Sequence, residues 1–103
     1  VEESDAMSPT GDEHFDSMSV EMNKWASIGE VERTKKIFNQ LEEYGIPPIN
    51  NWNRVLHNTV LKAYAKAGEY RGACSWVELM DKKGIDMNPK ALGKLLSAAA
   101  ESG

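Results

Sequence analysis

Apolar residues recur along most of this chain at the three- and four-residue spacing of amphipathic helices. The spacing begins near residue 18 and is interrupted wherever a glycine follows an apolar stretch. No stretch alternates apolar and polar residues with the period of a strand. The pattern therefore predicts helices alone, over about residues 18–28, 31–44, 51–67, 70–83 and 89–103.

Local signals set the ends of these predicted helices. Asp16 or Ser17 is placed to cap the first helix, and an asparagine at position 50 or 51 is placed to cap the third. The last helix opens on the asparagine-proline pair at 88–89, which combines an amide cap with a proline at the first helical position. Each of the first four predicted helices is followed by a glycine, a residue that favours the left-handed conformation that stops a helix.

Part of the helical pattern occurs twice. Gly29 and Gly45 are sixteen residues apart (45 − 29), and so are Gly68 and Gly84 (84 − 68). The apolar positions between them match when the two segments are superimposed: Ile37 with Trp76, Phe38 with Val77, and Leu41 with Met80. An internal period near 35 to 40 residues is typical of stacked helical repeats. The prediction is an all-α fold, an α-solenoid of antiparallel helix pairs whose third copy contains only its first helix.

Charge divides the chain into two parts. Residues 1–17 hold six carboxylates and no Lys or Arg, so the other 86 residues carry a formal charge of +2 (12 − 10). We interpret residues 1–17 as a flexible acidic arm that serves as a linker or folds back over a basic surface. Residues 18–103 form the predicted repeat domain, with units at about 18–49, 50–88 and a partial third at 89–103.

The middle unit resembles a known family. The stretch from Asn58 to Gly68, ending Lys-Ala-Gly, and the later Lys-Lys-Gly-Ile at 82–85 with a closing Asn88 are similar to the pentatricopeptide repeat. The interval from Gly45 to Gly68 is four residues longer than that from Gly84 to Gly103, which has the family's usual length. Since four residues make about one helical turn, we expect an extra turn at the start of the third helix, which should disturb the stacking of the first two units.

The resemblance implies single-stranded RNA binding in chloroplasts or mitochondria, with one base read per repeat. In the middle unit the reading residues would be Asn58 and Asn88, with Val55 packing against the base and Lys62 and Lys66 available to phosphates. The other units lack such a set, because isoleucine or glycine stands where a reading amide is needed. One competent unit and one doubtful unit would together supply about 2 to 6 kcal/mol, less than the ~8 kcal/mol of a micromolar complex.

An unfinished stack favours protein partners instead. The last predicted helix carries Leu92, Leu95 and Leu96 on one face without its second helix, and the first helix begins with Met18 and Met22. Trp52 lies on the inserted turn, where it either packs in the core or anchors a partner. The sequence therefore predicts a non-catalytic adaptor, an accessory subunit of a larger photosynthetic, respiratory or ribosomal assembly in an organelle, with single-stranded RNA binding as the alternative.

Catalytic chemistry has little support. The two histidines are separated in sequence, and we read His57 as a packing or capping residue. The single cysteine, Cys74, excludes cysteine-based zinc sites and is expected to be a buried thiol. We expect no enzyme activity, cofactor, metal or DNA partner, and no apolar stretch reaches the ~18 residues of a membrane span.

Overall fold

The computed structural model describes residues 12–48, 51–85 and 93, and in these residues it contains helices and no strand. The helices are α1 (Glu13–Ser27), α2 (Val31–Tyr44), α3 (Trp52–Ala67) and α4 (Tyr70–Lys83). The all-α prediction is confirmed, and the predicted bounds of the second, third and fourth helices agree with α2, α3 and α4. Gly93 is helical and exposed, and the rest of the predicted third unit lies outside the described residues.

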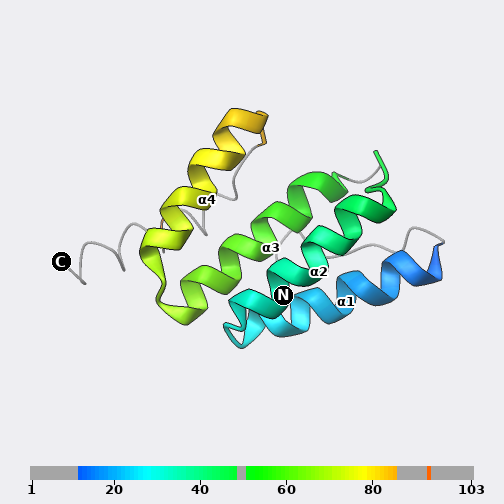
Figure 1. The fold of residues 1–103 in the computed structure, drawn as a ribbon, viewed down its shortest axis with the longest axis horizontal. Coiled ribbons are helices and arrows are strands. Elements are labelled where there is room, and N and C mark those ends of the chain that lie inside the picture. The colour runs from blue at the N-terminus through cyan, green and yellow to red at the C-terminus, as the bar shows by residue number, and fades with distance from the viewer. Residues whose placement is uncertain (1–11, 49–50, 86–92, 94–103) are drawn as a thin grey trace.

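The helices α1, α2 and α3 lie side by side, and α4 flanks α3 on the side away from α1 (Figure 1). The backbone of α3 lies close to each of the other three helices, whereas the backbone of α4 lies close to α3 alone among the described helices. This order, in which successive pairs stack through their first helices, is that of a helical-repeat fold.

The first helix begins earlier than the apolar spacing predicted. Asp12, not Asp16 or Ser17, is the N-cap of α1, and its Oδ1 accepts a hydrogen bond from the Phe15 amide at 3.1 Å. The prediction was wrong because Phe15 stands alone among carboxylates in the sequence, so its burial was not apparent. The side chain of Phe15 is 1 % exposed, which places the end of the proposed acidic arm inside the folded domain.

This earlier start brings the two units into register. The interval from Glu13 to Trp52 equals the interval from Val31 to Tyr70, so both helices of one unit begin at positions equivalent to those of the other. The Phe15 and Trp52 rings meet edge to face with centroids 4.9 Å apart. The expected disturbance of stacking is therefore wrong: the turn that Trp52 adds to α3 is matched by the turn that Phe15 adds to α1.

The turn between α1 and α2 brings the backbone close to α3. Gly29 has φ +79°, and the Glu30 amide donates back to the Trp25 carbonyl at 3.0 Å, which closes α1 in a Schellman arrangement. A Cβ at Gly29 would lie 3.2 Å from the Ala67 amide nitrogen. By contrast, Gly45 ends α2 at φ 115° and ψ 109°, outside the left-handed helical region expected for it.

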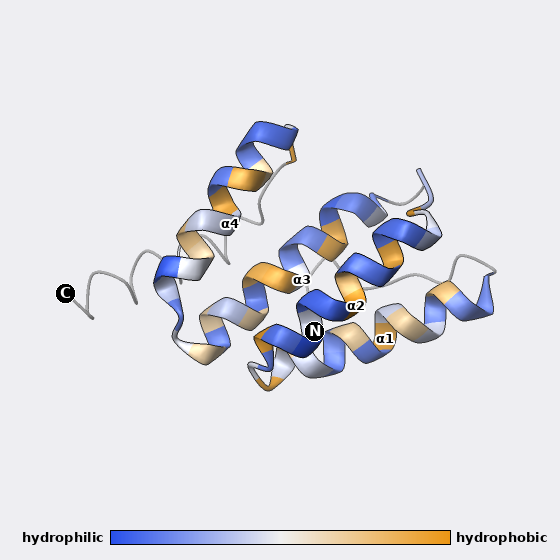
Figure 2. Cartoon of the chain, viewed as in Figure 1, coloured by the Kyte–Doolittle hydropathy of each residue, from blue (hydrophilic) through white to orange (hydrophobic). Residues whose placement is uncertain are grey.

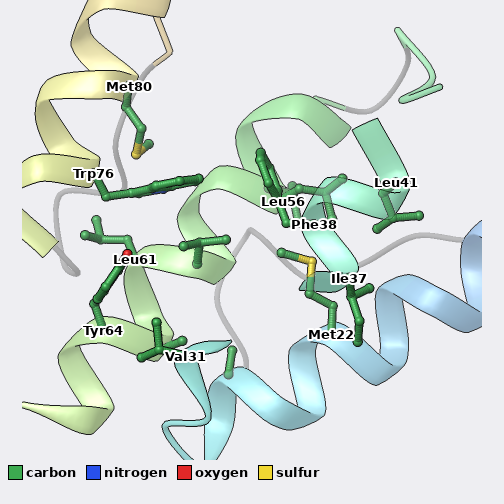
Figure 3. Close-up of a cluster of buried hydrophobic side chains, with 14 of the residues drawn as sticks. Met22, Val31, Ile37, Phe38, Leu41, Leu56, Leu61, Tyr64, Trp76 and Met80 are labelled. Atoms are coloured by element: carbon green, nitrogen blue, oxygen red, sulfur yellow. The ribbon is translucent and has the colours of Figure 1, made fainter. Parts of the chain in front are cut away.

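One hydrophobic core runs through all four helices (Figure 2). None of the Asp, Glu, Lys or Arg residues that the structure describes is buried, whereas a few uncharged polar side chains and His57 are. In α3, ten of the sixteen residues are buried, because this helix has neighbours on several sides. Figure 3 shows how side chains of the four helices meet around it. The fully covered apolar members include Met22, Leu41, Leu56, Val60, Leu61 and Met80.

Two side chains are more accessible than the sequence suggested. Trp25, expected in the core, is half-buried and packs against its edge. Cys74, expected to be a buried thiol, is exposed. Its neighbour Ala73 is buried, so Ala73 lies on the face of α4 that packs on the core and Cys74 lies just outside that face.

Candidate functional site

The two residues of α3 that were predicted to contact a base are buried. Val55 is 6 % exposed and Asn58 is 7 % exposed. The Asn58 Nδ2 donates to the Arg54 carbonyl, one turn earlier in the same helix, at 2.9 Å. This bond uses only one of the two Nδ2 hydrogens, so it is the burial of the amide that limits the approach of a base edge. The second reading residue, Asn88, lies outside the described residues.

The two lysines expected to contact phosphates differ from each other. Lys66 is exposed. Lys62 is half-buried, and its Nζ donates to Asn23 Oδ1 on α1 at 3.4 Å. Asn23 and Lys62 are 39 residues apart and occupy equivalent positions of the two units. The lysine thus links the first helices of neighbouring units.

Trp52 and Met22, proposed as partner anchors, are buried within the chain. Trp52 is 2 % exposed and Met22 is 0 % exposed, so neither side chain can present itself to a partner. The expectation for Met22 was wrong, because helical spacing alone does not reveal which neighbour covers a face. Of the two alternatives left open for Trp52, the structure supports packing in the core, against Phe15 of α1. Met18 is half-buried at the edge of the core. Leu92, Leu95 and Leu96 lie outside the described residues.

The Trp52 indole carries an orphaned donor. Its Nε1 is buried and has no hydrogen-bond partner among the residues that the structure describes. Trp76 on α4 contrasts with it, because the Trp76 Nε1 donates to the His57 carbonyl at 2.9 Å. Trp76 is therefore both a packing residue and a polar tie between α4 and α3.

His57 lies at the junction of three helices and is 0 % exposed. Its Nδ1 is 2.7 Å from the Asn53 carbonyl oxygen, and its Nε2 is 3.1 Å from Lys83 Nζ at the end of α4. Lys83 also lies 3.3 Å from Glu42 Oε2 on α2. The expected packing role of His57 is confirmed, and the polar ties to α4 are an addition that no sequence spacing indicated.

Burial lowers the pKa of His57 below its ordinary value, and the positive charge of Lys83 lowers it further. The Asn53 carbonyl and the carboxylate of Glu42 act in the opposite direction on that pKa, but they do not outweigh burial. The imidazole is therefore neutral at neutral pH.

A mixed aromatic and cationic surface lies at the α1–α2 turn. The Arg33 guanidinium lies 4.5 Å from the centroid of the Trp25 ring, and Lys24 Nζ lies 5.6 Å from it. Trp25 Nε1 donates to Glu21 Oε2 at 3.3 Å. Ile28, at the end of α1, is 63 % exposed. This group, here called the turn surface, was not found from the sequence because Trp25 was assigned to the core.

A family model, that of the PPR repeat, matches residues 55–85. The chain contains a PPR repeat. The resemblance inferred for the middle unit is thereby confirmed, and the repeat comprises most of α3, all of α4 and the turn at Gly68. No curated protein and no solved structure shows significant similarity to the chain.

The described part of the PPR repeat and its neighbouring unit carry no cluster suited to metal binding. Within residues 12–48, 51–85 and 93, no three or more His, Cys, Asp or Glu side chains are placed to hold a metal ion. Among the same residues, no helix is long and apolar enough to cross a bilayer.

Proposed function

We propose that this chain is a non-catalytic helical-repeat adaptor that binds other proteins as an accessory subunit of a larger organellar assembly. A photosynthetic, respiratory or ribosomal complex would be such an assembly. The carrying observation is the closed state of the PPR repeat's reading position: Asn58 is buried and already bonded to its own helix. Burial of this amide disfavours contact with a base, so the exposed surfaces of the repeat are better suited to contact with a protein.

The turn surface supports the proposal. Tryptophan and arginine are the side chains most enriched at interface hot spots, and Trp25 and Arg33 are already stacked on each other. The stacking limits the side-chain entropy that binding would cost. The adjoining Ile28 adds exposed apolar area. The proposal extends to Met18 and to Leu92, Leu95 and Leu96, the anchors that the sequence indicated at the two ends of the stack.

Site-specific crosslinking tests the adaptor proposal. A photoreactive amino acid at Ile28 is compared with one at Gln40, which is also exposed but lies on the polar face of α2. In an extract of chloroplasts or mitochondria, the probe at position 28 should give a discrete product that unlabelled chain suppresses and Trp25→Ala weakens. Equal products from both positions, or none that unlabelled chain suppresses, would reject the turn surface as a docking site.

Single-stranded RNA binding is the second candidate, and the PPR repeat itself favours it. Exposed Lys66 is free to approach a phosphate, and Lys62 would do so on leaving Asn23. If this candidate is right, a pyrimidine-rich oligonucleotide should bind, Asn58→Ala should weaken binding by about 1 to 3 kcal/mol, and Lys66→Ala should lower the salt slope by about 1. Fluorescence anisotropy at two salt concentrations measures both. No binding at micromolar chain would remove RNA from consideration.

A further inference from the structure

Helix α4 contacts α2 through Trp76 and Lys83, and these same two side chains meet at one residue of α3. The backbone of α4 approaches α3 alone among the described helices, and two of its side chains end on His57. Trp76 Nε1 donates to the His57 carbonyl at 2.9 Å, and Lys83 Nζ contacts the His57 ring at 3.1 Å. The second contact lies in the last turn of α4 and the first near its middle, so together they fix the direction of the helix.

The hydrogen bonds of the ring define where its proton lies. A carbonyl oxygen can only accept, so the contact with Asn53 requires the proton on Nδ1. Nε2 then has a free lone pair, which accepts from the Lys83 ammonium. A second proton can be added only at Nε2, where it would remove that acceptor and place two cations in contact.

The groups around the ring give the added charge little compensation. From α2, the Phe38 ring meets the imidazole nearly at right angles with centroids 4.8 Å apart. From α4, the Trp76 ring lies 5.7 Å away and Lys83 is the facing charge. Glu42 on α2 is the acidic group that faces this junction, and it lies 3.3 Å from Lys83. A protonated His57 would have to compete with Lys83 for that carboxylate.

We propose that His57 is a proton-sensitive joint: a proton at its Nε2 expels Lys83 and loosens α4 from α3, while α1, α2 and α3 stay packed. Above about pH 6.5 the imidazole is neutral in both the folded and unfolded chains, and the joint is intact. As the pH falls below about 6.5 the unfolded chain takes up a proton that the folded chain resists, so stability is lost toward acid. The joint is independent of which partner the chain binds.

Amide hydrogen exchange of the full chain tests the joint at about pH 7.5 and about pH 5.5, with rates corrected for the intrinsic effect of pH. His14 is the other histidine of the chain and is exposed, so His14→Gln is the matched control for His57→Gln. In the wild type and in His14→Gln, exchange in α4 should rise several-fold relative to α2 at the lower pH. In His57→Gln the ratio should stay constant.

Equal changes in α4 and α2, or the same acid effect in His57→Gln, would overturn the proposal. Should His57→Gln fail to fold, Lys83→Met provides a second test, because it keeps the imidazole and removes the facing cation. NMR titration of the His57 ring should then give a pKa nearer its ordinary value than in the wild type, with a smaller acid effect on α4. An unchanged ring titration in Lys83→Met would equally refute the joint.

Discussion

The two helices of the PPR repeat are held very differently. In α3, ten of sixteen residues are buried, whereas in α4 three of fourteen are buried. The reason is position: the backbone of α3 lies close to α1, α2 and α4, and that of α4 lies close to α3 alone among the described helices. Among the described helices, α3 is therefore packed on several sides and α4 on one side.

This difference indicates where the structure should yield first. Elements with few buried apolar contacts open with a lower free energy than the global unfolding transition. A helix attached mainly through Trp76, Met80 and Lys83 is such an element, and α3 is not. Local opening should therefore separate α4 from α3 before α1, α2 and α3 separate from one another.

A leucine-to-alanine substitution in α3 and one in α4 should show the largest difference in the free energy of unfolding. Leu61 on α3 is 0 % exposed, and Leu79 on α4 is half-buried at the edge of the core. Leu61→Ala should lower the free energy of unfolding by about 2 to 5 kcal/mol, because it leaves a cavity in the core. Leu79→Ala should cost about 1 kcal/mol or less. Denaturant titration measures both, and equal losses would contradict the comparison.

The next largest difference in unfolding free energy is expected between glycine substitutions in the turns of the two units. Gly29 and Gly68 both have positive φ, but a Cβ at Gly68 would meet nothing within 4 Å, whereas one at Gly29 would lie 3.2 Å from the Ala67 backbone. Gly68→Ala should cost about 1 to 2 kcal/mol of unfolding free energy through backbone strain alone. Gly29→Ala should cost about 1 kcal/mol more, because α3 must also shift. A smaller loss for Gly29→Ala than for Gly68→Ala, measured by denaturant titration, would mean that the turn does not press on α3.

The two buried indoles offer a finer test of what holds α4. Trp76→Phe removes a hydrogen bond to the His57 carbonyl, and Trp52→Phe removes an N–H that has no partner in the described part of the chain. Both lose similar ring volume, so the difference between them reports on the polar group. Trp76→Phe should be the more destabilising by about 1 kcal/mol. If thermal and denaturant unfolding rank the two variants the other way, the Trp76 tie contributes nothing to α4.

The smallest effect is expected in the first unit, where Asp12 links the start of α1 to the end of α2. Its Oδ2 accepts from the Tyr44 hydroxyl at 2.5 Å, and this bond, ahead of the bond from the Phe15 amide, lowers the pKa of Asp12. The contribution is therefore present above the carboxyl's ordinary pKa of about 3.9 and is lost as the pH falls through the lower folded value. Tyr44→Phe should slightly flatten the acid limb of the stability profile. Thermal melts across the acid range measure it, and an acid limb identical to that of the wild type would exclude the link.

Much of the fold could be predicted because its signals are local. Glycines at positions 29, 45, 68 and 84 and the spacing of apolar residues between them indicated the ends of α2, α3 and α4. The start of α1 could not be found this way. Phe15 is isolated among acidic residues, and only its contact with Trp52, in the next unit, explains why it is helical and buried.

The site was harder to predict, because accessibility depends on neighbours that are distant in sequence. The resemblance to the pentatricopeptide repeat predicted Asn58 as a reading amide, but its burial and its bond to Arg54 become visible only when the helices are assembled. For the same reason Met22 was expected at the surface, and Trp52 was left open between the core and the surface. Trp25 shows the opposite error. Its spacing predicted a core position, but in the assembled helices its side chain is half-buried at the edge of the core, beside Arg33.

The common register of the two units limits how the chain can be recombined. Asn23 and Lys62 occupy equivalent positions 39 residues apart, and this separation is the length of one unit. A graft that exchanges a block of this length keeps every helix facing its present neighbours. The residue at the position of Phe15 then still lies opposite Trp52. A block four residues shorter would shift a helix by about 6 Å along its axis and rotate it by about 40°, since the α-helix rises about 1.5 Å and turns about 100° per residue. Shuffling this segment with repeats of the more usual length would therefore turn apolar side chains toward water at every junction.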